Sequence, residues 1–308
     1  MTVVPSMESA PAYTNGRADE LIRSGRSREA RELLSGSLPS IERRGDRAAL
    51  RQAVNLLGAA SFETGELGDA EVAFNRALEL GRSDNDDLLV ARATNNLGAI
   101  ANVRGEREQA IAMYSLAIAA YQRLGQPRGL ASAYHNMAIT FRHIGLLERA
   151  DEYERRAIEF AMEAENPHIL SLARIGRAEL SLLRGDARLA EATALLVARE
   201  FASRSDPHQQ ANALRVVGAA RTALGDLDGA RRALDDGLTL AREHSAALAE
   251  AELLRARAEL NCWLHDRAAA RADASEAIRI FDRLAAREDS DKLARWLAAV
   301  EQQVNGQC

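Results

Sequence analysis

The stretch NNLGAIANVRGEREQA, from Asn95 to Ala110, decides the fold because its small residues recur along the chain at a fixed spacing. A glycine returns every 40 residues, and an alanine follows five residues after it. Self-similarity at a period between about 20 and 50 residues indicates a repeat protein. The shared positions are Gly25, Gly65, Gly105, Gly145, Gly185, Gly225 and His265, then Ala30, Ala70, Ala110, Ala150, Ala190, Ala230 and Ala270.

Each period predicts two helices joined by a turn. Apolar residues recur at steps of three and four through 87–103 and again through 107–124, which is the spacing of one helical face. Gly105 suits the left-handed position that ends a helix, and Asn166 before Pro167 is a helix-start signal. We therefore expect an all-α solenoid of about seven helix-turn-helix repeats.

The domain boundaries follow from the same 40-residue spacing. We expect a disordered tail over 1–16 and a capping helix and tail over 287–308, where Leu293, Trp296 and Val300 form an apolar stripe. A solenoid needs such a polar-faced cap to stay soluble; the alternative is a docking helix for a partner. The repeats are predicted near 17–46, 47–86, 87–126, 127–166, 167–206, 207–246 and 247–286.

The repeated pattern resembles the tetratricopeptide repeat over about residues 17–285. The likeness rests on Leu57, Gly58, Gly65, Ala70, Phe74, Ala77 and Leu78, and again on Leu97, Gly98, Gly105, Ala110, Tyr114, Ala117 and Ile118. The period of 40 exceeds the family's commoner 34, so the chain is similar to the long-repeat arrays of kinesin light chains, Pins-like adaptors and bacterial regulators. The resemblance implies a right-handed superhelix with a concave groove lined by the first helix of each repeat.

Candidate peptide-binding residues follow from the groove positions that the resemblance implies. An asparagine amide both donates and accepts hydrogen bonds, so a row of asparagines can hold an extended peptide backbone, as it does in kinesin-light-chain-like arrays. Arginines there can pair with carboxylates. The alternatives are that the amides bond neighbouring repeats and that the arginines are solvated charges. The candidates are Asn55, Arg92, Asn95, Asn96, Asn102, His135, Asn136, Arg142 and His143.

The groove is expected to change character at the fifth repeat. Leu172, Ile175, Leu182 and Leu183 predict an apolar patch there, after a polar and basic-leaning stretch in repeats three and four. A segment with an acidic or polar end and a hydrophobic anchor would suit such a groove. Tight curvature that buries the patch is the alternative.

Several classes of function are disfavoured by composition. The net charge of −5 argues against a nucleic-acid binder, which needs a basic surface. The chain has no apolar run of membrane-spanning length and no signal-peptide pattern, so we expect a cytoplasmic protein. Two cysteines and scattered histidines predict neither a metal site nor a cofactor. Catalytic motifs such as GxSxG and HExxH are absent, so we expect no enzyme.

The function predicted from these features is protein binding. The first hypothesis is a scaffold or adaptor that holds a peptide segment of a partner protein in the concave groove. The second is a peptide-sensing bacterial regulatory receptor that controls an effector on another chain. The third is a homo-oligomer formed through the last repeat and the C-terminal helix; otherwise we expect a monomer or a weak homo-oligomer.

Overall fold

The computed structural model describes residues 11–302, and within that range every regular element is an α-helix. This confirms the all-α prediction. The helices are α1 (Pro11–Arg23), α2 (Ser27–Arg43), α3 (Arg47–Glu63), α4 (Leu67–Ser83), α5 (Asp87–Val103), α6 (Arg107–Arg123), α7 (Pro127–His143), α8 (Leu147–Glu163), α9 (Pro167–Leu183), α10 (Ala187–Ser203), α11 (Pro207–Leu224), α12 (Leu227–Glu243), α13 (Ala247–Trp263), α14 (Arg267–Arg283) and α15 (Arg287–Gln302).

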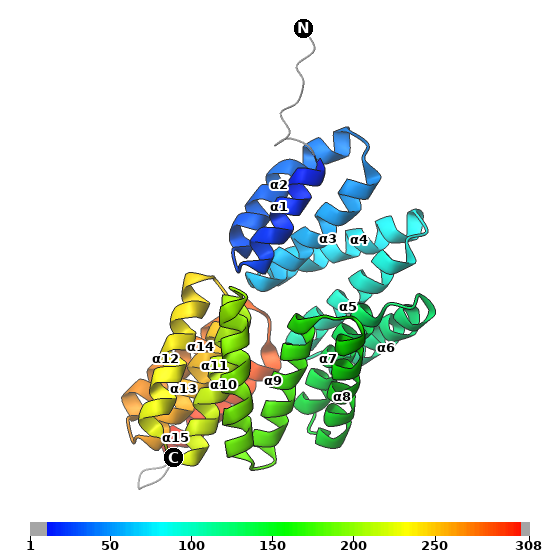
Figure 1. Cartoon of the computed structure of the whole chain (residues 1–308). Helices are drawn as coiled ribbons and strands as arrows, with labels where there is room; N and C mark the ends of the chain where they lie inside the picture. The colour runs from blue at the N-terminus through cyan, green and yellow to red at the C-terminus, as the bar shows by residue number, and fades with distance from the viewer. Residues whose placement is uncertain (1–10, 303–308) are drawn as a thin grey trace.

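Helices α1 to α14 form seven hairpins, and α15 follows as a single helix (Figure 1). The prediction that the whole of 1–16 is a disordered tail is wrong for residues 11–16, which belong to α1. Proline suits the first turn of a helix, and buried Asn15 ties α1 to α3 by donating to the Ala49 carbonyl at 2.9 Å. The remainder of the predicted tail, 1–10, lies outside the described residues.

The turns inside the hairpins have the left-handed glycine that the repeat pattern predicts. Gly105 has a φ of +83°, in the left-handed region, and the next residue donates its N–H to the Ala101 carbonyl at 2.9 Å. Helix starts differ from one repeat to another. Asp186 and Asp226 accept a hydrogen bond from the backbone of the first turn, whereas Glu66 and Glu106 make no such bond.

Small residues let the two helices of a hairpin approach closely. A Cβ atom on Gly58 would lie 2.5 Å from Phe74 Cε1, and one on Gly98 would lie 2.8 Å from Tyr114 Cε1. Both aromatic rings are 1% exposed. Each ring therefore fills the space that the facing glycine leaves, and each hairpin buries its remaining apolar face against the next.

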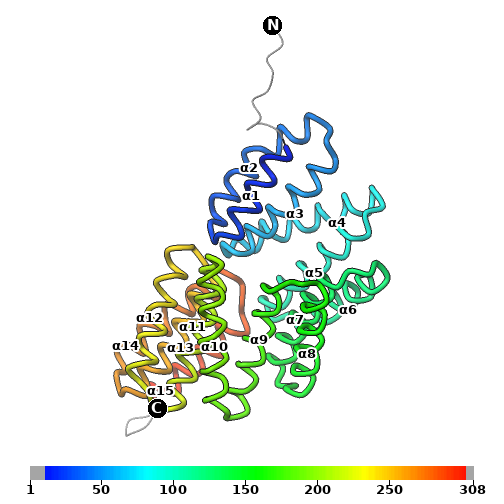
Figure 2. The backbone as a smooth tube through the Cα atoms, viewed as in Figure 1, coloured from blue at the N-terminus to red at the C-terminus, as the bar shows by residue number. Residues whose placement is uncertain are grey.

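The solenoid closes on itself within one chain. Figures 1 and 2 show α1 and α2 lying above α11 and α12, with the intervening helices completing the turn. A Cβ on Gly25 would lie 2.4 Å from Pro207 Cγ, and one on Gly65 would lie 2.9 Å from Ala247 Cβ. The first contact joins repeat one to repeat six, and the second joins repeat two to repeat seven. We call this joint the seam; it was not predicted from the sequence.

Helix α15 covers the last hairpin. Leu293 and Val300 are buried, and Trp296 and Leu297 pack partly buried against the cluster formed by α12–α14. The expected apolar stripe therefore faces inward, as a capping helix requires. No helix among residues 11–302 is long and apolar enough to cross a membrane.

Candidate functional site

Two adjoining cavities lie on the inner face of the superhelix. The first has a volume of about 660 Å³ and is lined mainly by α3, α5, α7 and α9. The second has a volume of about 320 Å³ and also receives side chains from α11, α13 and α15. Leu172 lines both. The first helices therefore build a continuous channel, and all nine candidate residues line one of its two cavities.

Three of the candidate asparagines form a cluster where the cavities adjoin. The Asn136 amide donates to Asn95 Oδ1 at 3.3 Å, and the Asn95 amide donates to Asn96 Oδ1 at 3.5 Å. Asn95 is only 5% exposed, while Asn96 and Asn136 are half-buried. Within residues 11–302 nothing accepts a hydrogen bond from the Asn96 amide nitrogen. Asn95 thus holds two neighbours whose polar atoms face the channel.

The first cavity also carries cations that no acid neutralises. Arg92 and Arg128 are exposed, line the cavity and form no ion pair with another described residue. Arg51 differs, because its guanidinium lies 2.6 Å from Asp84. Asn55 completes this wall, and its buried Oδ1 finds no hydrogen-bond donor in the described part of the chain. A buried acceptor without a donor is costly. Asn55 Oδ1 is such an unsatisfied atom within the wall, whereas the two exposed arginines face the cavity.

The Asn102 side-chain oxygen accepts hydrogen bonds from neighbouring helices and is not free to bind a ligand in the channel. This atom, Oδ1, accepts from Thr140 Oγ1 at 2.9 Å and from Arg107 Nη1 at 2.7 Å. The side chain is 8% exposed. These two bonds connect α5 with α6 and α7, which is the structural alternative considered for the asparagines.

His135 pairs with an acid that the sequence did not single out. Its Nδ1 lies 3.0 Å from Glu154 Oε2, and Glu154 is 1% exposed. Burial raises the pKa of Glu154, although the imidazole and Arg142 oppose the rise. A Cβ on Gly176 would lie 1.9 Å from Glu154 Oε1. Glycine at that position therefore makes room for the buried carboxylate.

Arg142 belongs to a chain of alternating charges along the second cavity. It pairs with Glu179, which also pairs with Arg215, and Arg215 Nε lies 3.2 Å from Glu252 Oε2. Arg255 lies 3.5 Å from Glu252. Burial alone would raise the pKa of Glu252, but Arg215 and Arg255 lower it to about 2. Arg142 is thus already neutralised, and no local pattern could have predicted Glu252 as a participant.

His143 lines the second cavity as a neutral ring. Burial, with help from Arg142 and Arg107, lowers its pKa to about 3, and its Nδ1 is buried without a partner within residues 11–302. In the described residues no group of three His, Cys, Asp or Glu side chains could hold a metal ion. His143 is therefore an uncharged part of the channel wall.

The apolar patch is smaller than the sequence predicted. Leu172 and Ile175 line the channel together with Ile139 and Leu248. Leu183 does not, because it ends α9 at the outer turn and is 58% exposed. The patch therefore spans neighbouring first helices rather than one repeat.

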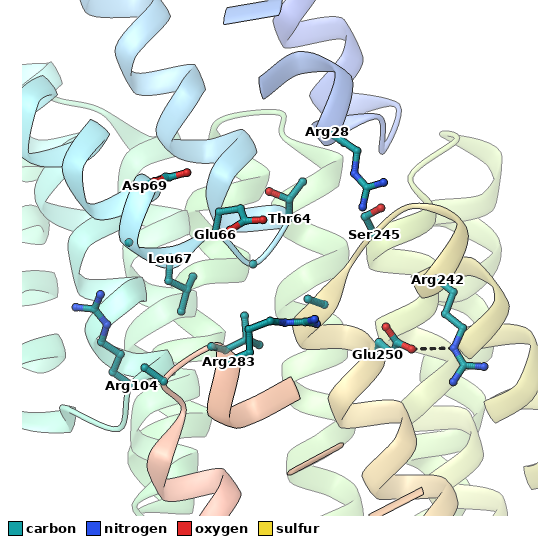
Figure 3. Close-up of a pocket in the computed structure, with 15 residues that line it drawn as sticks. Arg28, Thr64, Glu66, Leu67, Asp69, Arg104, Arg242, Ser245, Glu250 and Arg283 are labelled. Carbon is teal, nitrogen blue, oxygen red and sulfur yellow. Dashed lines mark hydrogen bonds and ion pairs between the residues drawn. The ribbon is translucent and has the colours of Figure 1, made fainter. Parts of the chain in front are cut away.

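A further crevice of about 470 Å³ lies at the seam, outside the channel. Figure 3 shows the side chain of Arg28 reaching toward Ser245, with Glu66 and Arg283 further along the crevice. Ion pairs between residues that line the crevice lie at the protein surface. For example, Arg242 Nε lies 2.8 Å from Glu250 Oε1. The crevice marks where the turns of early and late repeats meet.

Comparison with known proteins matches part of the chain to a family. Residues 89–163 match the family model described as tetratricopeptide repeat. No curated protein matches the chain by sequence. This part of the chain therefore carries tetratricopeptide repeats, and the match covers parts of two predicted repeats.

Solved structures of low sequence identity share the whole fold. A Rap protein complexed with competence and sporulation factor is 15% identical, with a TM-score of 0.63, and covers 95% of this chain and 98% of its own. The apo form of RapI is 10% identical, with a TM-score of 0.63, over 89% and 98%. The apo quorum sensor NprR from B. thuringiensis is 12% identical, with a TM-score of 0.56, over 96% and 81%.

Proposed function

We propose that this protein is a non-catalytic adaptor that binds an extended segment of a partner protein inside the channel. The observation that carries the proposal is the asparagine cluster at the junction of the two cavities. Asn96 and Asn136 present amides to the channel, and Asn95 orients both. An amide pair can satisfy both the N–H and the C=O of a peptide unit whatever its side chain.

The channel also sets the chemistry of the segment. Arg92 and Arg128 supply positive charge to the first cavity, and arginine binds carboxylates in two-pronged geometry. Ile139, Leu172 and Ile175 supply apolar surface to the second. A segment with an acidic or polar end followed by a hydrophobic side chain fits both, and the hydrophobic anchor would supply most of the binding energy.

A sensory role is the second candidate, and the closed ring favours it. The second cavity is lined by α3 and α5 on one side and by α11, α13 and α15 on the other. A ligand there would contact both halves of the ring, so its binding would shift the equilibrium between closed and open forms. The likeness in fold to the Rap protein complexed with competence and sporulation factor and to the quorum sensor NprR supports a receptor of this kind, with an effector on another chain.

A selection experiment tests the proposal. Random dodecapeptides displayed on phage would be selected on the wild-type chain, and the affinity of enriched peptides measured by fluorescence anisotropy. The Asn96→Ala/Asn136→Ala variant should bind them at least about tenfold more weakly. Asn75→Ala is the matched control, because Asn75 is exposed on α4 outside the channel. Equal affinity for all three chains would contradict the proposal.

Scattering separates the two candidates. An adaptor with a fixed ring should keep its radius of gyration when the selected peptide is added. A sensor should change it, because the ligand binds the open and closed rings with different affinity.

A further inference from the structure

The outer turns, which join the two helices of each hairpin, form one rim of the superhelix. In the first three repeats the later repeats cover this rim at the seam. Gly25 meets Pro207, Gly65 meets Ala247, and a Cβ on Gly105 would lie 3.0 Å from Glu288 Cβ. The rim is therefore a surface that packs against protein in this fold.

The same rim is uncovered in repeats four to seven. A Cβ on Gly145, Gly185 or Gly225 would meet no atom within 4 Å. We call this surface, formed by the outer turns at 144–149, 183–189, 224–228 and 263–266, the free rim. More than half of the chain's large exposed hydrophobic residues among those described lie on it, which indicates an interface. They are Ile144 (42% exposed), Leu146 (44%), Leu183 (58%), Leu189 (53%), Leu224 (40%) and Trp263 (64%).

Charge is distributed unevenly along the free rim. Arg149 and Arg188, in repeats four and five, are exposed and form no ion pair with another described residue. Asp228, in repeat six, is exposed and likewise unpaired within residues 11–302. Asp226 and Asp266 add acidic caps at the same end. Repeats four and five also hold Glu148 and the acidic cap Asp186, together with a further arginine, Arg184. One half of the rim is thus basic-leaning and the other acidic.

The opposite rim of the molecule is a poor match for this surface. It consists of the turns between repeats, and its free part, at 44–46, 84–86 and 124–126, is mostly polar or charged. The free rim is apolar, and its two halves carry opposite charge. It is therefore complementary to itself when two copies run in opposite directions.

We propose that the free rim binds a second copy of this chain about a twofold axis between repeats five and six. The free rim follows a superhelical curve, and a twofold axis perpendicular to the superhelix axis maps such a curve onto itself. The free rims of two copies can therefore stay in contact along their whole length. Because the outer turns of repeats five and six then face each other, Arg188 meets the partner's Asp228, its equivalent at the 40-residue period. Leu183 lies beside the partner's Leu224, which is one position from the equivalent residue Ala223. Ile144 likewise lies beside the partner's Trp263, one position from the equivalent residue Leu264.

Sedimentation equilibrium of the full chain, up to about 100 µM, tests the proposal because it detects micromolar dimers. Wild type should have twice the chain mass of 33.5 kDa. Leu183→Glu/Leu224→Glu should sediment as a monomer. Leu116→Glu is the matched control, since Leu116 is 66% exposed on α6, away from the rim, and it should remain dimeric. Circular dichroism verifies that each variant is folded.

A charge swap tests the twofold pairing itself. Arg188→Asp and Asp228→Arg should each weaken dimerisation about tenfold, and the chain carrying both changes should regain the wild-type constant. A wild-type monomer at the highest concentration, or a Leu183→Glu/Leu224→Glu chain as dimeric as wild type, would overturn the proposal. Failure of the double swap to recover would also overturn it.

Discussion

Arg107 Nε donates a hydrogen bond to Glu288 Oε2 at 2.9 Å, although 181 positions separate the two residues. Arg107 begins α6, and Glu288 lies in the first turn of α15. The same guanidinium donates to Asn102 Oδ1 at 2.7 Å, on the channel wall. One largely buried arginine, with a side chain 10% exposed, therefore connects the seam with the surface proposed to bind a ligand.

Glu288→Gln should lower the free energy of unfolding by about 1 kcal/mol, because Arg107 loses a charged acceptor while keeping Asn102. The Glu288 side chain is 33% exposed, so solvent screens part of the interaction. Urea denaturation measures the change. Glu20→Gln removes an exposed i,i+3 pair with Arg17 and should cost less than about 0.5 kcal/mol. Equal losses in the two variants would show that the seam pair contributes no more than a surface pair.

Two glycine substitutions should change stability in opposite directions. Gly58→Ala places a Cβ 2.5 Å from Phe74 Cε1 and should cost about 1–3 kcal/mol through overpacking. Gly68→Ala meets no atom within 4 Å, in the first turn of α4. It should stabilise the fold by about 0.4–1 kcal/mol, because alanine restricts the unfolded chain. Thermal denaturation of both variants decides the matter; a stabilised Gly58→Ala chain would contradict the packing account.

Glu179→Gln should be among the most damaging single changes in the channel. Glu179 is 13% exposed and accepts from both Arg142 and Arg215. Removing its charge leaves two largely buried guanidinium groups short of a partner, at a cost of about 3 kcal/mol. The control is Glu152→Gln, which breaks an exposed pair with Arg156. Chemical denaturation should separate the two variants clearly, and similar midpoints would argue against the charge chain as a stabilising feature.

The seam should respond to pH through His208. Burial works against the charged imidazole, but the hydrogen bond and charge of Glu63 outweigh it and raise the pKa of His208. The stabilisation is therefore fully present below the unfolded pKa of about 6.5 and is lost as pH rises through the raised folded pKa. Unfolding free energies measured from pH 5 to pH 9, roughly the span around that value, should show this decline in wild type. The Glu63→Gln variant should lose it, and an unchanged slope in that variant would contradict the assignment.

The fold could be predicted because the residues that determine each helical hairpin all lie within that hairpin. The glycine at 105, the small residue at 98 and the ring at 114 act within one hairpin, where spacing along the chain equals proximity in space. Ring closure could not be predicted in this way. Gly25 and Pro207 meet only because the small rotation of each repeat relative to the one before it accumulates over five repeats. The sequence of a single turn does not reveal this total rotation.

The placement of the candidate residues along the channel could be predicted from the sequence, whereas their hydrogen-bond and ion-pair partners could not. All nine candidates line the channel because helical periodicity fixes which side chains face inward. Whether they are available depends on partners from other repeats. Glu154 engages His135, and Glu179 engages Arg142. Asn96 and Arg92 retain free hydrogen-bonding capacity among the described residues, and they carry the proposed function.

The most direct test of the peptide-binding proposal is where a bound peptide lies. A selected dodecapeptide carrying a benzophenone at each position in turn would be photo-cross-linked to the chain, and the modified residues identified by mass spectrometry. The account predicts cross-links to α5, α7 and α9 at channel-lining residues such as Asn96, Ile139 and Leu172. Cross-links confined to the second helices, α4, α6 and α8, would place the peptide on the outer face and contradict it.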